Sequence, residues 1–310
     1  MASTTSISSN YAGFASADYI SAALFEGKTL SMGLINIIPN IKHKFHIQKV
    51  DFSNDLVQAY AATFNDTSTL THTERTLDPT DLMVNFKHDI KAYEAMWDAE
   101  RMTAGAGNSQ PSPTLQSYIL NQMGKQTSQI MEFELWRGNM TGNSVTISGY
   151  TKFDGLLRVI DQASPQRVSA TTLTKSNILY ELGRVYDSWN SNVSQIPALN
   201  AKLFVPVDVP GMYNQAIASG NSAVHGYYIG DKPMDFLGVE LIPTPGLPSN
   251  FIVMAEPKNL YFGTDLTSDM NSVRLVDMRD TTADYNFRYR ADFKAGTQVA
   301  VGAQIVFYKP

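Results

Sequence analysis

The side chains that could bind a metal ion are few in this sequence. His43 and His46 are its closest pair of histidines. They lie three residues apart in a stretch that alternates like a strand, so they point to opposite faces and cannot share a metal ion. Two aspartate pairs are spaced four residues apart, Asp265 with Asp269 and Asp280 with Asp284. Because these pairs lack the spacing and central glycine of an EF-hand loop, we expect turn or cap residues and no metal site.

Motifs for catalysis or cofactor binding are also incomplete. Gly105 and Gly107 begin a Gly-x-Gly, but the third glycine and the preceding strand of a dinucleotide loop are missing. There is no Gly-x-Ser-x-Gly elbow and no complete phosphate-binding loop, and the absence of cysteine excludes thiol catalysis and disulfides. We therefore assign no catalytic residue and no cofactor, and expect a protein that is not an enzyme.

The composition is polar but poor in charge. Only 17% of the 310 residues are charged, against about 25% in typical globular domains. The cores of protein interfaces are depleted in charge in the same way. The net charge is −5, and the single basic cluster, at residues 42–49, is short. These features indicate extensive contact with protein partners and exclude a sequence-specific DNA-binding protein.

Neither a targeting signal nor a membrane span is evident. The first residues, Met1 to Ser6, lack the basic and apolar regions of a signal peptide. The apolar run from Leu34 to Ile38 ends at Pro39 and is far shorter than a membrane-spanning helix. We expect synthesis in the cytoplasm and no contact with a membrane.

The elements that must position any functional surface begin with an extended arm, residues 1–40. The arm starts with a run of small polar residues. A short helix is predicted over residues 17–25, and glycines interrupt any longer one. It carries scattered large anchors, among them Tyr11, Phe14, Tyr19 and Phe25. Such an arm cannot bury these side chains against itself, so it must lie on another surface, either of its own subunit or of a neighbour.

Two alternating segments follow the arm. Residues 45–52 and residues 82–90 alternate between apolar and polar side chains, as half-buried strands do. The polar stretch between them, Thr63 to Thr80, predicts the tip of a long two-stranded hairpin. A strand of about 15 residues reaches roughly 50 Å, further than a small domain needs for its own core. The hairpin is therefore expected to contact another subunit.

Helices are predicted over residues 90–102, 113–137 and 175–193. Ser112 and Pro113 suit the start of the second helix, and Gly138 its end. This helix would be a rod of roughly 37 Å. Its apolar positions recur at helical spacing: Leu115, Ile119, Met123, Ile130, Phe133 and Trp136. The tryptophans Trp97, Trp136 and Trp189 fall on apolar stripes and are expected in the core, with subunit contact as a second role for Trp136.

Strands dominate the remaining sequence. A buried strand is predicted at residues 203–205, followed by short strands and turns over residues 226–262. Two alternating segments, residues 285–293 and 299–307, are predicted as strands joined by a turn at Ala295-Gly296.

The order of these pieces resembles the coat-protein fold of tailed bacteriophages, which is shared with encapsulin shells and herpesvirus capsid floors. The resemblance spans nearly the whole chain. It rests on short sequence segments, each only approximately matched, that occur in a specific order. They are Phe153-Asp154-Gly155-Leu156-Leu157, residues 236–243, residues 251–263, residues 273–275 and Arg288-Tyr289-Arg290-Ala291-Asp292.

This resemblance implies an α+β fold with five parts. They are an N-terminal arm (1–40), an extended β-hairpin loop (41–90), a peripheral domain (91–140) with a spine helix (113–137), an axial domain (141–272) and closing strands of the peripheral domain (273–310). The residues expected at assembly contacts are Tyr11, Phe14, Tyr19, Phe25, Phe64, Thr69, Glu74, Arg75 and Trp136.

The implied function is that of a major capsid protein, which self-assembles into hexamers and pentamers of an icosahedral phage head around double-stranded DNA. Its expected partners are copies of itself, a separate scaffolding protein, a portal and, through non-specific contact, DNA. No lysine lies between Lys49 and Lys87, so covalent cross-linking from the extended loop is not expected. An encapsulin-type nanocompartment shell, and a β-rich binding protein or unrecognised enzyme, stay open as alternatives.

Overall fold

The computed structural model describes most of the chain. The described residues are 28–52, 60, 69–89, 113–140, 150–193, 196–219, 234–265, 273–278 and 286–310. The helices predicted over residues 17–25 and 90–102 lie outside these ranges, as do Tyr11, Phe14, Tyr19 and Phe25 of the arm.

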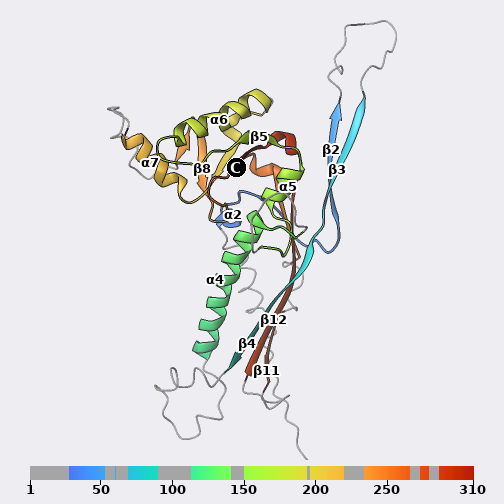
Figure 1. The fold of residues 1–310 in the computed structure, drawn as a ribbon. Coiled ribbons are helices and arrows are strands. Elements are labelled where there is room, and N and C mark those ends of the chain that lie inside the picture. Colours follow the sequence, from blue (N-terminus) through green and yellow to red (C-terminus); the bar gives the residue numbers. More distant parts are fainter. Residues whose placement is uncertain are drawn as a thin grey trace, which may run out of the picture.

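One sheet and one long helix form the elongated half of the molecule (Figure 1). The helix α4 runs from Pro113 to Arg137, as predicted, beside the sheet. The strand order is β1-β10-β12-β11, and β4 also pairs with β12. The strands are β1 (Asn36–Ile38), β4 (Thr80–Asp89), β10 (Leu260–Thr264), β11 (Val273–Asp277) and β12 (Asn286–Val299). The short helices α2 (Lys28–Ser31) and α5 (Leu156–Gln162) lie close to the C-terminal end of α4.

The second half is built on a six-stranded sheet in the order β5-β13-β9-β6-β8-β7. Its strands are β5 (Gln166–Ser169), β6 (Lys202–Val205), β7 (Asp235–Phe236), β8 (Val239–Pro243), β9 (Ile252–Ala255) and β13 (Val306–Lys309). Two helices lie with this sheet, α6 (Ile178–Asn192) and α7 (Val209–Ser219). Single-turn helices are η4 (Ala198–Asn200), η6 (Pro257–Asn259) and η8 (Gly302–Gln304).

Two apolar clusters lie on opposite faces of the six-stranded sheet. The α6 stripe and the strands of the six-stranded sheet bury one cluster, which includes Trp189. The other cluster joins the end of α4 and the long sheet to the second face of the six-stranded sheet, and it includes Trp136, Phe204 and Phe307. The two halves meet where the Trp136 and Phe204 rings pack with centroids 5.2 Å apart. Trp136 and Trp189 are fully buried, which confirms their predicted place in the core.

The predicted turn at Ala295-Gly296 is wrong, because β12 continues through both residues to Val299. Ala295 and Gly296 pair with Thr264 and Gly263 of β10. A Cβ atom on Gly296 would lie 3.1 Å from the backbone of residues 78 and 79. The small residues therefore allow close packing of backbones, which a sequence pattern does not distinguish from a turn. The alternation over residues 299–307 is also not one strand, since η8 separates β12 from β13.

The structure contains the extended hairpin, but the prediction of residues 82–90 as its second strand is wrong. The strand β2 (Phe45–Phe52) pairs antiparallel with β3 (Leu70–Leu77), which lies inside the predicted polar tip. The alternating segment that was predicted as its partner is β4, which pairs with β12 in the long sheet. Threonine, histidine and charged residues occupy β3, so a strand exposed on both faces carried no apolar alternation to reveal it.

Candidate assembly surfaces

The β2–β3 ribbon is the first candidate, because it projects away from both halves of the molecule (Figure 1). The register runs from Phe45 opposite Leu77 at the base to Phe52 opposite Leu70. These two strands form a sheet of their own. An isolated two-stranded ribbon is marginally stable in water, because it has no third layer to cover a face. A partner surface would supply that cover.

The two faces of the ribbon differ in their apolar content. At the base, Ile47 and Leu77 are buried on one face. Further out, Val50 and Leu70 lie on the other face. Val50 is directly opposite His72, and Leu70 is on the same face as His72 because it lies two residues away in the same strand. Val50 is 46% exposed and Leu70 is 52% exposed. The outer part of the ribbon therefore presents apolar side chains to solvent.

The base of the ribbon is attached firmly to the long sheet. Gln298 of β12 donates a 2.6 Å hydrogen bond from Nε2 to the carbonyl of Thr76. A Cβ atom on Gly263 of β10 would lie 2.7 Å from the ends of the Ile41 and Leu77 side chains, so β10 packs closely against the base of the ribbon. These contacts fix the direction in which the ribbon leaves the body.

Ion pairs on the ribbon are local and exposed. Lys44 pairs with Asp78 at 3.2 Å, and His46 lies 3.9 Å from Glu74 and 3.2 Å from the hydroxyl of Thr76. Exposed pairs of this kind contribute little to stability.

In the part of the chain that the structure describes, no three potential ligands gather for a metal ion. Nor does a described helix have the length and apolar character needed to cross a bilayer.

The predicted contact residues fall into three groups. Thr69 and Glu74 are exposed on the ribbon, and Arg75 is half-buried beside a polar pocket of about 300 Å³ at its base. Trp136 has no exposed surface, so a second role in subunit contact is not available to it in this conformation. Tyr11, Phe14, Tyr19, Phe25 and Phe64 lie outside the described residues.

A buried hydrogen-bond network joins α2, where the described chain begins, to α4. Glu132 is 5% exposed and accepts hydrogen bonds from the amide and the hydroxyl of Thr29. The same hydroxyl accepts a 3.0 Å hydrogen bond from Nε1 of Trp136. Burial raises the pKa of Glu132, although the bonds from Thr29 and the charge of Lys28 oppose this shift. The arm is thus held to the long helix by polar groups that water cannot reach easily.

Further contacts hold the end of α4 to the six-stranded half. Glu134 accepts a hydrogen bond from the amide of Lys152, and burial raises the pKa of Glu134. Arg137 donates to the carbonyls of Gly246 and Leu247 at 2.7 and 2.9 Å, and its guanidinium lies 5.0 Å from the centre of the Phe133 ring. Nothing in the sequence signalled these buried carboxylates, because glutamates on a helix usually face water.

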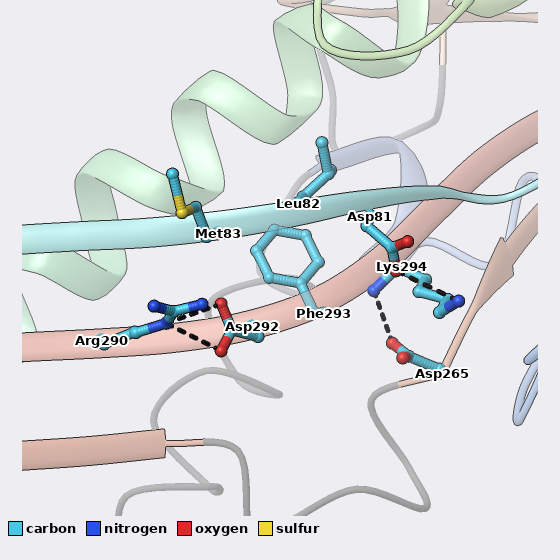
Figure 2. A pocket seen from close by; sticks show the side chains of 8 residues that line it. All are labelled: Asp81, Leu82, Met83, Asp265, Arg290, Asp292, Phe293 and Lys294. Carbon is cyan, nitrogen blue, oxygen red and sulfur yellow. Dashed lines mark hydrogen bonds and ion pairs between the residues drawn. The ribbon is translucent and has the colours of Figure 1, made fainter.

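The long sheet provides a second candidate surface, an open pocket of about 490 Å³ (Figure 2). Lys294 pairs with Asp81 at 3.1 Å, and the amide of Lys294 donates to Asp265. Arg290 pairs with Asp292 at 2.9 Å. The exposed thioether of Met83 lines the same pocket. Paired charges around an apolar side chain are typical of the rim of a protein interface.

Comparison with solved structures shows what fold this is. The chain is similar to the satellite phage P4 procapsid that includes the size determination (Sid) protein, with 14% identity, a TM-score of 0.58 and 93% and 89% of the two chains covered. It is similar to the capsid of Myoviridae phage XM1, with 13% identity, a TM-score of 0.56 and 91% of each chain covered. It is also similar to a virus-like particle from Pyrococcus furiosus, with 12% identity, a TM-score of 0.53 and coverage of 96% and 99%.

These similarities cover nearly the entire chain, and they confirm the predicted α+β capsid-protein fold of tailed phages. No protein-family model and no curated protein matches the sequence.

Proposed function

We propose that this chain, which has the fold of tailed-phage capsid proteins, is a major capsid protein that self-assembles into hexamers and pentamers of an icosahedral head. The observation that carries this proposal is the β2–β3 ribbon. It extends away from both cores and presents Val50 and Leu70 to solvent. A second copy of the chain would cover these side chains, whereas a monomeric binding protein has no need of such a projection.

The proposed mechanism of assembly needs no catalytic step. Each ribbon lies across the long sheet of a neighbour, and the part of the arm that precedes α2 adds further contact, since α2 and β1 pack on their own subunit. Each contact is modest, but a closed symmetric shell adds many of them together. The local ion pairs leave the ribbon nearly neutral, so apolar burial rather than charge supplies most of the attraction.

The parts of the subunit receive the following proposed roles. The extended loop is the β2–β3 ribbon within residues 41–79, and not the predicted 41–90, because β4 belongs to the long sheet. α4 is the spine of a peripheral domain that the long sheet completes, so β12 belongs to this domain and β13 does not. The six-stranded sheet with α6 and α7 forms the axial domain, which would surround the local symmetry axes. Its bounds differ from the predicted 141–272, because β13 belongs to this sheet and β10 belongs to the long sheet. We further propose a separate scaffolding protein, a portal and packaged double-stranded DNA as partners, with assembly in the host cytoplasm and a final place in the virion.

The test replaces the exposed apolar residues of the ribbon. The double variant Val50→Asp with Leu70→Asp should keep the fold of the subunit, because both side chains are about half exposed. It should lose shell formation, because two buried charges without partners would oppose the contact. Electron microscopy and size-exclusion chromatography of expressed protein, with scaffolding protein supplied, give the readout. The matched control is Val207→Asp, because Val207 is 62% exposed and lies outside the ribbon and the arm.

Normal shells from the double variant would refute the role of the ribbon. Wild-type protein that stays monomeric even with its scaffold would refute the capsid function itself. A nanocompartment shell that encloses a protein is the alternative with the same fold. Protein cargo in place of DNA inside shells isolated from the producing cells would identify it.

A further inference from the structure

A tight turn at the edge of the six-stranded sheet has an unexpected residue. The strands β7 and β8 pair antiparallel, and the two residues Leu237 and Gly238 join them. Both have positive φ, 51° for Leu237 and 83° for Gly238. This is a type I′ hairpin turn, for which asparagine or aspartate followed by glycine is strongly preferred. A leucine in the left-handed region is strained, because its Cβ approaches the following carbonyl.

The strained leucine does not contribute to the core of its own subunit. Leu237 is 62% exposed, and it belongs to an apolar patch with Leu199 of η4, which is 70% exposed. A Cβ atom on Gly238 would lie 3.1 Å from the side chain of Leu199, so the turn and η4 are in contact. We call Leu199 and Leu237 the β7-edge patch. A strained residue whose side chain is exposed indicates a functional contact with another molecule, because nothing inside the subunit requires that side chain.

The opposite edge of the same sheet carries a second apolar patch. β5 and β7 are the two outer strands. Thr171, just after β5, donates a 3.0 Å hydrogen bond to Glu181, and α6 also packs on β5 and β13. The first turn of α6 therefore lies over the β5–β13 end of the sheet, where Leu179 is 40% exposed and Tyr180 is 70% exposed. We call Leu179 and Tyr180 the β5-edge patch. Five strand spacings, about 24 Å, separate the two edges.

We propose that the β7-edge patch of one copy packs on the β5-edge patch of the next copy around a ring. Two different patches on opposite edges of one subunit make a head-to-tail contact, and such contacts close into rings when the rotation fits. A self-complementary dimer would instead need one patch that meets its own copy. This inference rests on the proposed capsid function, and it identifies which residues of the axial domain join neighbours within a hexamer or pentamer.

The first test separates folding from ring formation. Leu237→Asn supplies the residue that the turn prefers, so the melting temperature of the isolated subunit should equal or exceed that of the wild type. The subunit concentration needed for ring or shell formation should rise at least about tenfold, because each copy loses the burial of a leucine. Val207→Asn is the matched control, since Val207 is also 62% exposed but follows the central strand β6. Equal assembly by Leu237→Asn and the wild type would overturn the proposal.

The second test uses the absence of cysteine from this chain. The double variant Leu237→Cys with Tyr180→Cys should give, after oxidation of assembled shells, a ladder of disulfide-linked chains up to five or six copies on denaturing gels. Either single variant should give no ladder. Dimers from Leu237→Cys alone would show a self-complementary contact and overturn the proposal. Wild-type shells without a ladder from the double variant would refute this contact alone, whereas the absence of wild-type shells would refute the capsid function.

Discussion

Two buried glutamates in α4 show how single residues can bind the parts of this subunit together. Glu132 and Glu134 are 5% and 2% exposed, and each accepts hydrogen bonds from a segment distant in sequence. Their neighbours in the helix, Met131 and Leu135, fill the apolar core. The helix therefore uses its polar positions, as well as its apolar stripe, to hold other segments. Burial in such a site raises the free energy of the ionised carboxylate, because water no longer solvates its charge.

The stability of the subunit should depend on pH through Glu132. Its pKa is raised in the folded state above the ordinary value of 4.5, so the folded state holds the proton more tightly than the unfolded state. The contribution of Glu132 is therefore fully present below pH 4.5 and is lost as the pH rises through the raised folded value. Glu132→Gln cannot ionise and should escape this loss. Urea unfolding of both proteins over this range should show the variant gaining stability relative to the wild type as the pH rises.

A comparison with Glu132→Ala distinguishes ionisation from loss of the hydrogen bonds. Alanine leaves the amide and hydroxyl of Thr29 without their buried acceptor, which should cost about 1–3 kcal/mol at every pH. The glutamine variant keeps one of the two acceptor oxygens for Thr29, so its cost should be smaller than that of alanine and equally independent of pH. A constant difference between Glu132→Gln and the wild type over the whole range would show that Glu132 titrates normally in the fold.

At the scale of elements, the junction of α4 and α5 depends on backbones that approach closely. The amide of Gly155 donates a 2.8 Å hydrogen bond to the carbonyl of Gly138, which follows α4. A Cβ atom on Gly155 would lie 2.6 Å from the carbonyl oxygen of Glu134, a backbone atom that cannot rotate away. Gly155→Ala should therefore destabilise the subunit by about 1–3 kcal/mol, as measured by urea unfolding.

The control for this prediction is a glycine in an open position. Gly183 lies inside α6, and a Cβ atom there would meet nothing within 4 Å. Gly183→Ala should stabilise the subunit by about 0.5–1 kcal/mol, because alanine loses less conformational freedom in a helix. If both substitutions had the same effect, helix propensity rather than the close approach of α4 and α5 would explain them.

The elements that could be predicted from the sequence are those with one buried face. The helices α4 and α6 and the strand β6 carry regular apolar positions, and their predicted bounds differ from the observed ones by at most a few residues. The order of elements along the chain was sufficient to indicate the capsid-protein fold that the solved structures share.

The elements that were predicted wrongly have either no buried face or contacts with distant residues. β3 is mostly exposed on both faces, so no alternation marked it. The pairing of β4 with β12 joins residues about two hundred positions apart, and no local pattern specifies which strand is its partner. The β7-edge patch could not be predicted from the sequence. A leucine followed by glycine is also compatible with an apolar strand, and only the positive φ of Leu237 shows that a turn lies there.

At the scale of the whole molecule, the proposed assembly would have to overcome the like charge of the subunits. Each copy carries a net charge of −5, and a shell brings many copies together. The apolar contacts proposed at the ribbon and at the β7-edge patch do not weaken as salt screens charge. The ion pairs at the ribbon base and in the pocket of Figure 2 lie within one subunit, so their screening leaves the contacts between copies intact.

Added salt should therefore promote assembly. The screening length falls from about 30 Å at 0.01 M to about 8 Å at 0.15 M ionic strength, which removes most of the repulsion between neighbouring copies. The subunit concentration at which shells form, measured by light scattering, should fall over this range. Lowering the pH towards the pI of about 5.5 should act in the same direction, because it reduces the net charge without screening. Shells that dissociate as salt is added would mean that attraction between opposite charges, and not apolar burial, holds the copies together.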